Sequence, residues 1–330
     1  EFEEDVHALA CAFLANGLTP GASVAILAGN IPHWGIADLA AIAAGGVGVG
    51  IYPTSSAEQC EYIINHSEAE FVLVDSPKQK EKLLQIRSRL PKVKAIIEIT
   101  GNSGESEQAT EQVEETQVKT APEFFRYDEF IRIGRDRSAE FMPRVEAIGN
   151  GLKLTDTAIM VYTSGTTGMP KGAMLSHKYI LNSVESLRQT IPIFDDDVCF
   201  SYLPHCHVAE RISGLYNRLY NGTSVYFVND ITKLYKYMLE VKPTVFASLP
   251  RFFEKIHAKL VADSNGGEID AQTVKDAFGG RIRLLTSGGA ALPNEVADFF
   301  ARAGLPILQA YGLTENICVA FNRANDFKFG

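Results

Sequence analysis

The sequence is poor in cysteine, and its thiols form no paired motif. Five cysteines are scattered along the chain without a CxxC pair, at Cys11, Cys60, Cys199, Cys206 and Cys318. An odd number of dispersed cysteines indicates free thiols in a reducing compartment. The pattern argues against a disulfide-rich secreted domain and predicts a cytoplasmic protein.

The only group that resembles a set of metal ligands is His205-Cys206-His207. Adjacent residues on a strand point to opposite faces, so all three cannot easily ligate one zinc ion. We therefore expect a loop or the wall of a pocket here, and a buried core position for His205.

The chain also lacks an excess of positive charge and a long apolar run. Its net charge of −9 over 330 residues argues against a nucleic-acid-binding protein. The most apolar stretch, Ile36 to Tyr52, is interrupted by Asp38 and four glycines and is too short to span a membrane cleanly. No signal peptide or basic amphipathic helix is evident. With 46% hydrophobic residues the chain is expected to be soluble and globular, with one large domain or two ordinary ones.

Apolar segments of helical and strand period alternate along the chain, which predicts an α/β fold with a largely parallel sheet. Helices are expected at 2–18, 34–44 and 56–67. Strands are expected at 22–27, 45–52, 70–75, 158–162, 224–227, 244–247, 283–286 and 306–309. The segment 101–119 is polar, Glu-rich and without aromatic residues, so it is interpreted as a surface loop or disordered insertion between a first part, 1–100, and a second, 120–330.

The stretch YTSGTTGMPKG, Tyr162 to Gly172, has the composition of a phosphate-binding loop. It is not a Walker A loop, because Lys171 follows Pro170 instead of glycine and no hydroxyl follows the lysine. The run Ala173-Met174-Leu175 predicts a strand after the loop, with Ser176 as the N-cap of a later helix. Glycines, hydroxyls and one lysine between two strands suit an anion, whereas a solvated turn would not explain the lysine and the flanking strands.

This stretch closely resembles the signature phosphate loop of the adenylate-forming superfamily, which includes acyl-CoA synthetases, luciferases and peptide-synthetase adenylation domains. TSGGAALP at 286–293 and QAYGLTE at 309–315 resemble two further motifs of the family, in the family's order. The resemblance covers essentially the whole chain. It implies the large N-terminal domain of that fold, with parallel-rich sheets layered with helices and a smaller β-barrel-like region.

The resemblance also implies roles for individual residues. Lys171, Thr314, Glu315 and His207 are the implied catalytic residues, and Thr166 and Glu315 the implied ligands of Mg²⁺. The residues implied to bind the nucleotide are Thr163, Ser164, Gly165, Thr166, Thr167, Gly168, Lys171, Gly288, Gly289, Ala290, Gln309, Ala310, Tyr311, Gly312 and Thr314. From the residues alone, the glycine pair could equally be a tight strand-to-helix turn before Pro293, and Thr314-Glu315 could cap a helix.

Two further stretches, SYLPHCHVAER at 201–211 and SLPRFFEK at 248–255, resemble the long-chain fatty acyl-CoA synthetase branch. The implied reaction joins a fatty acid and ATP into an acyl-adenylate and transfers the acyl group to coenzyme A. Fatty acid, ATP and coenzyme A are thus the implied partners, and long acyl chains are compatible with peripheral contact with a membrane.

The family's ribose-binding TGD stretch, hinge and C-terminal domain with a catalytic lysine do not follow Glu315 in this sequence. We therefore expect an N-terminal portion, truncated at both ends and lacking the C-terminal lid domain, with little or no activity of its own. Three alternatives remain open: a ligase for another acid or for a carrier-protein acceptor, an ATPase or kinase, and a non-enzymatic binding module.

Overall fold

A computed structural model of the chain describes residues 1–99, 121–163, 169–267, 269–323 and 327–328. The chain divides into two compact units, which are described separately below. Unit 1 comprises residues 1–178 and 204–207, and unit 2 comprises residues 179–203 and 208–330.

Unit 1 is built on a seven-stranded sheet of order β5-β4-β3-β1-β2-β6-β7. Neighbouring strands are parallel, except that β6 and β7 form an antiparallel hairpin. The strands are β1 (Ser23–Leu27), β2 (Val47–Gly50), β3 (Ala69–Val74), β4 (Ala95–Glu98), β5 (Glu123–Arg126), β6 (Thr157–Thr163) and β7 (Lys171–Ser176).

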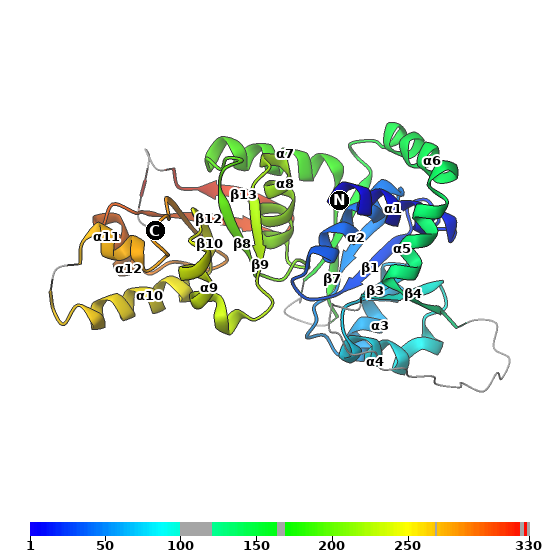
Figure 1. Cartoon of the computed structure of the whole chain (residues 1–330), viewed down its shortest axis with the longest axis horizontal. Helices are drawn as coiled ribbons and strands as arrows, with labels where there is room; N and C mark the ends of the chain where they lie inside the picture. The colour runs from blue at the N-terminus through cyan, green and yellow to red at the C-terminus, as the bar shows by residue number, and fades with distance from the viewer. Residues whose placement is uncertain (100–120, 164–168, 268, 324–326, 329–330) are drawn as a thin grey trace. The chain divides into compact units, whose positions relative to one another are not determined.

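Helices cover both faces of this sheet, with α1, α2, α5 and α6 on one side and α3 and α4 on the other (Figure 1). The side chains of β3 illustrate this arrangement. Phe71 packs on Phe13 of α1 and Phe130 of α5, whereas Val72 and Val74 lie in the core beneath α3 and α4. Successive side chains of a strand point to opposite faces, so a sheet buried on both faces is apolar throughout. The helices are α1 (Phe2–Ala15), α2 (Pro32–Ala43), α3 (Ala57–His66), α4 (Pro77–Ile86), the short 3₁₀ helix η1 (Arg87–Arg89), α5 (Tyr127–Asp136) and α6 (Ser138–Gly151).

Unit 2 contains a four-stranded sheet of order β10-β11-β12-β13 and a two-stranded parallel sheet, β8-β9. Its core is rich in phenylalanine: Phe246, Phe253, Phe278 and Phe300 pack around one another below the larger sheet. The strands are β8 (Val198–Ser201), β9 (Ser224–Phe227), β10 (Val245–Ser248), β11 (Leu284–Gly288), β12 (Ile307–Leu313) and β13 (Asn316–Phe321). The helices are α7 (His177–Thr190), the π-helix η2 (Ala209–Tyr216), α8 (Asn217–Asn221), the 3₁₀ helix η3 (Ile231–Lys233), α9 (Leu234–Val241), α10 (Pro250–Asp263), α11 (Ala271–Asp276) and α12 (Asn294–Arg302).

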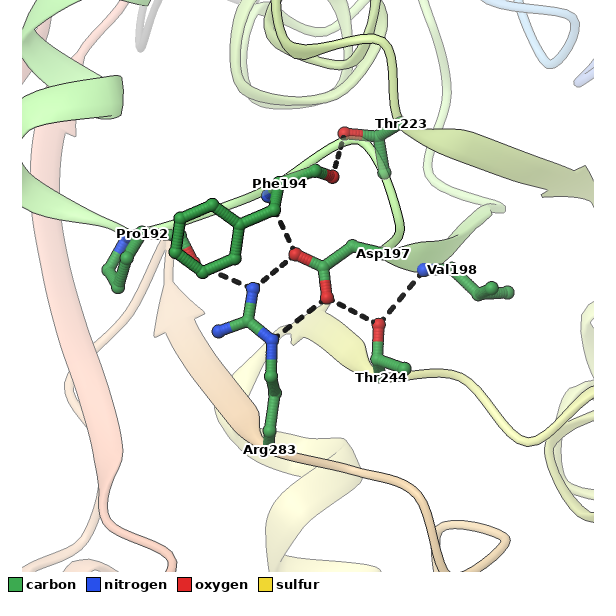
Figure 2. Close-up of polar contacts among 7 residues, drawn as sticks. All are labelled: Pro192, Phe194, Asp197, Val198, Thr223, Thr244 and Arg283. Carbon is green, nitrogen blue, oxygen red and sulfur yellow. Dashed lines mark hydrogen bonds and ion pairs between the residues drawn. The ribbon is translucent and has the colours of Figure 1, made fainter.

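A buried carboxylate ties together the starts of three strands of unit 2 (Figure 2). Asp197, which is 2% exposed, precedes β8 and pairs through both oxygens with Arg283, which precedes β11. The hydroxyl of Thr244, before β10, donates to Asp197 Oδ1 at 2.7 Å and accepts from the N–H of Val198 at 2.9 Å. Burial alone would raise the pKa of Asp197, but the bonds from Arg283, Thr244 and the Phe194 amide outweigh burial and lower it.

The expected α/β fold with parallel-rich sheets is confirmed. The expected helices 2–18, 34–44 and 56–67 correspond to α1, α2 and α3, and Ser56 caps α3 by accepting from the Gln59 amide at 3.2 Å. The described strands form three open sheets, so no β-barrel-like region is found among them. The acidic segment 101–119 lies outside the described residues. No helix in the part of the chain that the structure describes is long and apolar enough to cross a bilayer.

Candidate functional site

The segment expected to bind phosphate connects β6 and β7, which pair as an antiparallel hairpin. Thr163 and Lys171 form the last cross-strand pair before the loop, and the Lys171 side chain is exposed to solvent. The loop residues Ser164, Gly165, Thr166, Thr167 and Gly168 lie outside the described residues. The hairpin nevertheless confirms that the loop connects two strands, which distinguishes it from a Walker A loop before a helix.

Tyr162 and Gly172 pair across β6 and β7, next to the loop end of this hairpin. A Cβ atom at Gly172 would lie 3.0 Å from Cζ of Tyr162, so the tyrosine ring occupies the space that a side chain would need. The Tyr162 hydroxyl lies 2.7 Å from Nδ1 of His66 on α3. Burial raises the pKa of Tyr162 to about 12, so its hydroxyl keeps its proton at neutral pH. His66 was not singled out from the sequence, because only the tertiary structure brings α3 to the hairpin.

In unit 2, the motifs TSGG and QAYG lie side by side on neighbouring parallel strands. Ser287 pairs with Gln309 and Gly288 pairs with Ala310 at the carboxyl ends of β11 and β12. Beyond this pair, Gly289 takes a φ of +80° and both it and Ala290 are exposed. Tyr311 is 60% exposed, so its ring is accessible for stacking on a flat ligand. The structure thus brings six of the implied nucleotide-binding residues together at one edge of a sheet.

Thr314 and Glu315 form the two-residue turn between β12 and β13, which Leu313 and Asn316 flank as a cross-strand pair. The alternative interpretation of these two residues as a helix cap is wrong, because β13 follows the turn directly. Gly312 is required nearby, since a Cβ there would lie 2.2 Å from the carbonyl oxygen of Ile317. Glu315 is exposed, and its carboxylate is available to a ligand.

The segment Pro204 to His207 belongs to unit 1, where it contacts α2 and the end of β2. The His205 ring stacks on Trp34 with centroids 5.1 Å apart and an angle of 19° between the rings, and His205 is 3% exposed. A Cβ at Gly50 would lie 2.7 Å from Cα of Cys206. Glycine at the end of β2 therefore leaves room for the backbone of Cys206. His205 is therefore the expected core residue, whereas His207 is exposed.

The motif continues into the π-helix η2, which the sequence pattern did not predict. Glu210 is buried and accepts from Arg218 Nη1 at 2.6 Å and from the Ser201 hydroxyl at 2.7 Å. Arg218 also donates to the Phe200 carbonyl at 2.6 Å. The helix is thus fixed to β8 by a buried ion pair, and π-helical turns occur frequently at functional sites.

The described residues offer Mg²⁺ few protein ligands, as is typical of nucleotide-dependent sites, where phosphate and water complete the coordination. No cluster of three or more His, Cys, Asp or Glu side chains suited to a metal occurs among them. Mg²⁺ commonly takes one or two protein oxygens and completes its shell with phosphate and water. The single exposed carboxylate of Glu315 suits that arrangement, and the second implied ligand, Thr166, lies outside the described residues.

Fold and motif geometry together define an adenylate-forming enzyme domain, and comparison with known proteins agrees. The family model "AMP-binding enzyme" matches residues 1–328, so the chain belongs to this family. Among curated relatives, it is 30% identical to a human long-chain-fatty-acid–CoA ligase and 30% identical to long chain acyl-CoA synthetase 1 of Arabidopsis thaliana. Each alignment covers 96% of this chain, and 51% and 52% of those proteins.

The chain thus spans about half the length of the curated relatives it matches. Among solved structures, a benzoate CoA ligase from Burkholderia xenovorans LB400 has a TM-score of 0.72 at 21% identity. That match covers 100% of this chain and 58% of the other. At this identity the likeness shows the fold alone.

Proposed function

We propose that this chain is the nucleotide-binding part of a long-chain fatty acid–CoA ligase that forms AMP. The observation that carries the proposal is the pairing of Gly288 with Ala310 beside the Thr314-Glu315 turn, which gathers two family motifs at one sheet edge. The long-chain branch is supported by LPHCHVAER and LPRFFEK and by the names of the relatives. The second candidate is a ligase for another carboxylic acid, because the same fold occurs in a benzoate CoA ligase and so does not by itself select the acid.

In the proposed reaction the fatty carboxylate attacks the α-phosphorus of ATP and pyrophosphate leaves. The carboxylate needs no general base, because carboxyl groups with a pKa near ~4 are already ionised at neutral pH. The thiol of coenzyme A then attacks the acyl carbon and AMP leaves. Catalysis therefore depends on alignment of the reactants and on neutralisation of phosphate charge.

We assign these two tasks to residues of this chain by the chemistry of their side chains and backbone. Lys171 and the hydroxyls from Thr163 to Thr167 bind the phosphates that leave, with Gly165 and Gly168 exposing backbone N–H groups. Gly288, Gly289 and Ala290 admit the flat adenine ring, and Tyr311 stacks on it from the strand of Gln309 and Ala310.

Thr314 donates a hydrogen bond to phosphate, and Gly312 permits the turn that presents it. His207 contributes to the acyl side of the site. Glu315 and Thr166 would hold Mg²⁺, which when bound neutralises phosphate charge.

The function is tested by incubating the full-length gene product with ATP, Mg²⁺, hydroxylamine and one of four acids: palmitate, octanoate, acetate or benzoate. Acyl-hydroxamate formation is expected to be highest with palmitate. A preference for benzoate or acetate would refute the long-chain assignment but support the second candidate. Hydrolysis of ATP without any acid would contradict both and favour an ATPase.

A matched pair of lysine variants tests the phosphate loop. Lys171→Gln is expected to lower hydroxamate formation by about 100-fold, the order of loss seen when one electrostatic stabiliser is removed. Lys178→Gln, seven residues later on α7 and also exposed, should behave as wild type. Equal activity of both variants would exclude Lys171 from the reaction.

We further propose that turnover requires the part of the relatives that lies outside the stretch matched by these 330 residues. The chain alone is then expected to bind ATP weakly and to release little pyrophosphate. Fatty-acid-dependent pyrophosphate release by the chain alone would overturn this proposal. A cytoplasmic location and peripheral contact with membranes remain predictions, which fractionation of cells with an antibody to the chain would test.

A further inference from the structure

The turn that carries Thr314 and Glu315 is attached to helix α7 by a single tyrosine. The hydroxyl of Tyr179 donates to the carbonyl oxygen of Thr314 at 3.0 Å. The same hydroxyl accepts from the backbone N–H of Ile317 at 3.2 Å. A hydroxyl offers one donor and two acceptor sites, so both bonds form together. Tyr179 therefore bridges the two sides of the hairpin turn.

A second contact fixes the same hairpin to the same helix one turn further along. The Cys318 thiol lies 3.7 Å from the carbonyl oxygen of Ser183, which is within the range of a weak S–H hydrogen bond. Tyr179 and Ser183 are four residues apart and lie on one face of α7. The hairpin thus packs along α7, and its turn lies at the Tyr179 end.

The tyrosine remains a hydrogen-bond donor over the whole physiological pH range. Burial raises its pKa to about 12, although the bond from the Ile317 amide lowers it in part. At neutral pH the hydroxyl therefore keeps the proton that it donates to the carbonyl oxygen of Thr314.

We propose that Tyr179 is a positioning residue for adenylation, which holds the Thr314-Glu315 turn in the orientation that binds phosphate and Mg²⁺. The inference rests on the proposed function, because the roles of Thr314 and Glu315 belong to it. Tyr179 lies outside the motifs that reveal the family, and it acts through the backbone of the turn without touching the substrate.

The chain provides a closely matched control. Tyr220 on α8 donates its hydroxyl to Glu185 at 2.9 Å, so it too is bonded to α7, but not to the hairpin. Tyr179→Phe removes a phenolic hydroxyl that joins α7 to the hairpin, whereas Tyr220→Phe removes one that joins α7 to α8. Only the first removes the link to the turn.

In the full-length gene product, Tyr179→Phe is expected to lower kcat about tenfold, since loss of one hydrogen bond to the turn is worth roughly one factor of ten. It should also raise the Mg²⁺ concentration that gives half-maximal activity several-fold, while the KM for the fatty acid stays unchanged. A merely structural role would not move the Mg²⁺ requirement. Tyr220→Phe should leave kcat and the Mg²⁺ requirement at wild-type values.

A measurement without catalysis separates this inference from the proposed function. Hydrogen exchange at the amides of 314–318 should be faster in Tyr179→Phe than in wild type, and unchanged in Tyr220→Phe. Wild-type protein that activates no acid would refute the proposed function and, with it, the positioning role of Tyr179 in adenylation. An active wild type with equal kcat and equal Mg²⁺ requirement in both variants would refute the positioning role alone.

Discussion

The hydroxyl of Tyr162 and Nδ1 of His66 lie 2.7 Å apart, although 96 positions separate them in the chain. This bond fastens the hairpin of the phosphate loop to helix α3, and it involves the first residue of the motif YTSGTTGMPKG. Lys171 is paired with the very next residue, Thr163. The cross-strand pair that includes Lys171 thus lies next to a tyrosine that is bonded to another layer of unit 1.

Tyr162→Phe should lower the free energy of unfolding of the chain by about 1 kcal/mol, the usual net contribution of one hydrogen bond. Urea unfolding measures this change, and Tyr226→Phe on the exposed part of β9 is the control. In the full-length gene product the same variant should raise the KM for ATP. Identical unfolding midpoints for the two variants would show that the bond to His66 contributes nothing.

Gly172→Ala should impair ATP binding more than it lowers the stability of the folded chain. The new methyl group would lie 3.0 Å from the Tyr162 ring, and the ring must move away from its place beneath the hairpin. We expect the KM for ATP to rise more than threefold with a loss of about 1 to 3 kcal/mol in stability, as for other overpacked sites. The control is Gly149→Ala on α6, where a Cβ meets nothing within 4 Å. An unchanged KM for ATP in Gly172→Ala would contradict the role of this pair.

The stability of the chain should decrease in acid through Asp197. Its folded pKa is lowered from an ordinary value near ~3.9, so the stabilisation that it provides is complete above about pH 5. That stabilisation is lost as the pH falls through the lowered pKa of the folded state. Urea unfolding of wild type between pH 7 and pH 3 should show this loss, whereas Asp197→Asn should be less stable at pH 7 and should vary less with pH.

The exposed pair of Asp298 and Arg302 provides the comparison, because an exposed ion pair contributes little. Asp298→Asn should follow the wild-type pH dependence. The interpretation of Figure 2 as a stabilising network fails if Asp197→Asn has the same pH dependence as wild type.

The ion pair of Glu210 and Arg218 should show strong coupling in a double-mutant cycle. Glu210→Leu leaves a buried guanidinium without its carboxylate, at a cost of about 3 to 5 kcal/mol in unfolding free energy. Adding Arg218→Met removes that isolated charge, so the double variant should be more stable than Glu210→Leu. For comparison, Asp263→Ala at the exposed pair with Lys259 should change stability by less than about 1 kcal/mol. Additive effects of the Glu210 and Arg218 substitutions would rule out the coupling.

Local chemistry made a large part of this protein predictable. Alternating helical and strand periods gave most elements of unit 1 to within a few residues, because each buries an apolar face whose period depends only on backbone geometry. The spacing of Gly165, Gly168 and Lys171 excluded a Walker A loop and placed the loop between two strands. Gly304, with a φ of +72°, follows the end of α12, a position at which glycine commonly ends a helix.

The tertiary structure decided what lies beside these motifs. It paired Gly288 with Ala310, turned Thr314-Glu315 into a hairpin tip and packed His205 on Trp34. It also brought His66 to Tyr162 and Tyr179 to Thr314, contacts between residues about 100 positions apart or more. Such contacts depend on how layers pack and on which backbone groups need partners. The hydrophobic period of a single segment predicts neither. The sequence alone thus determined the family and the chemistry of the motifs, and the packed fold determined which residues hold those motifs in place.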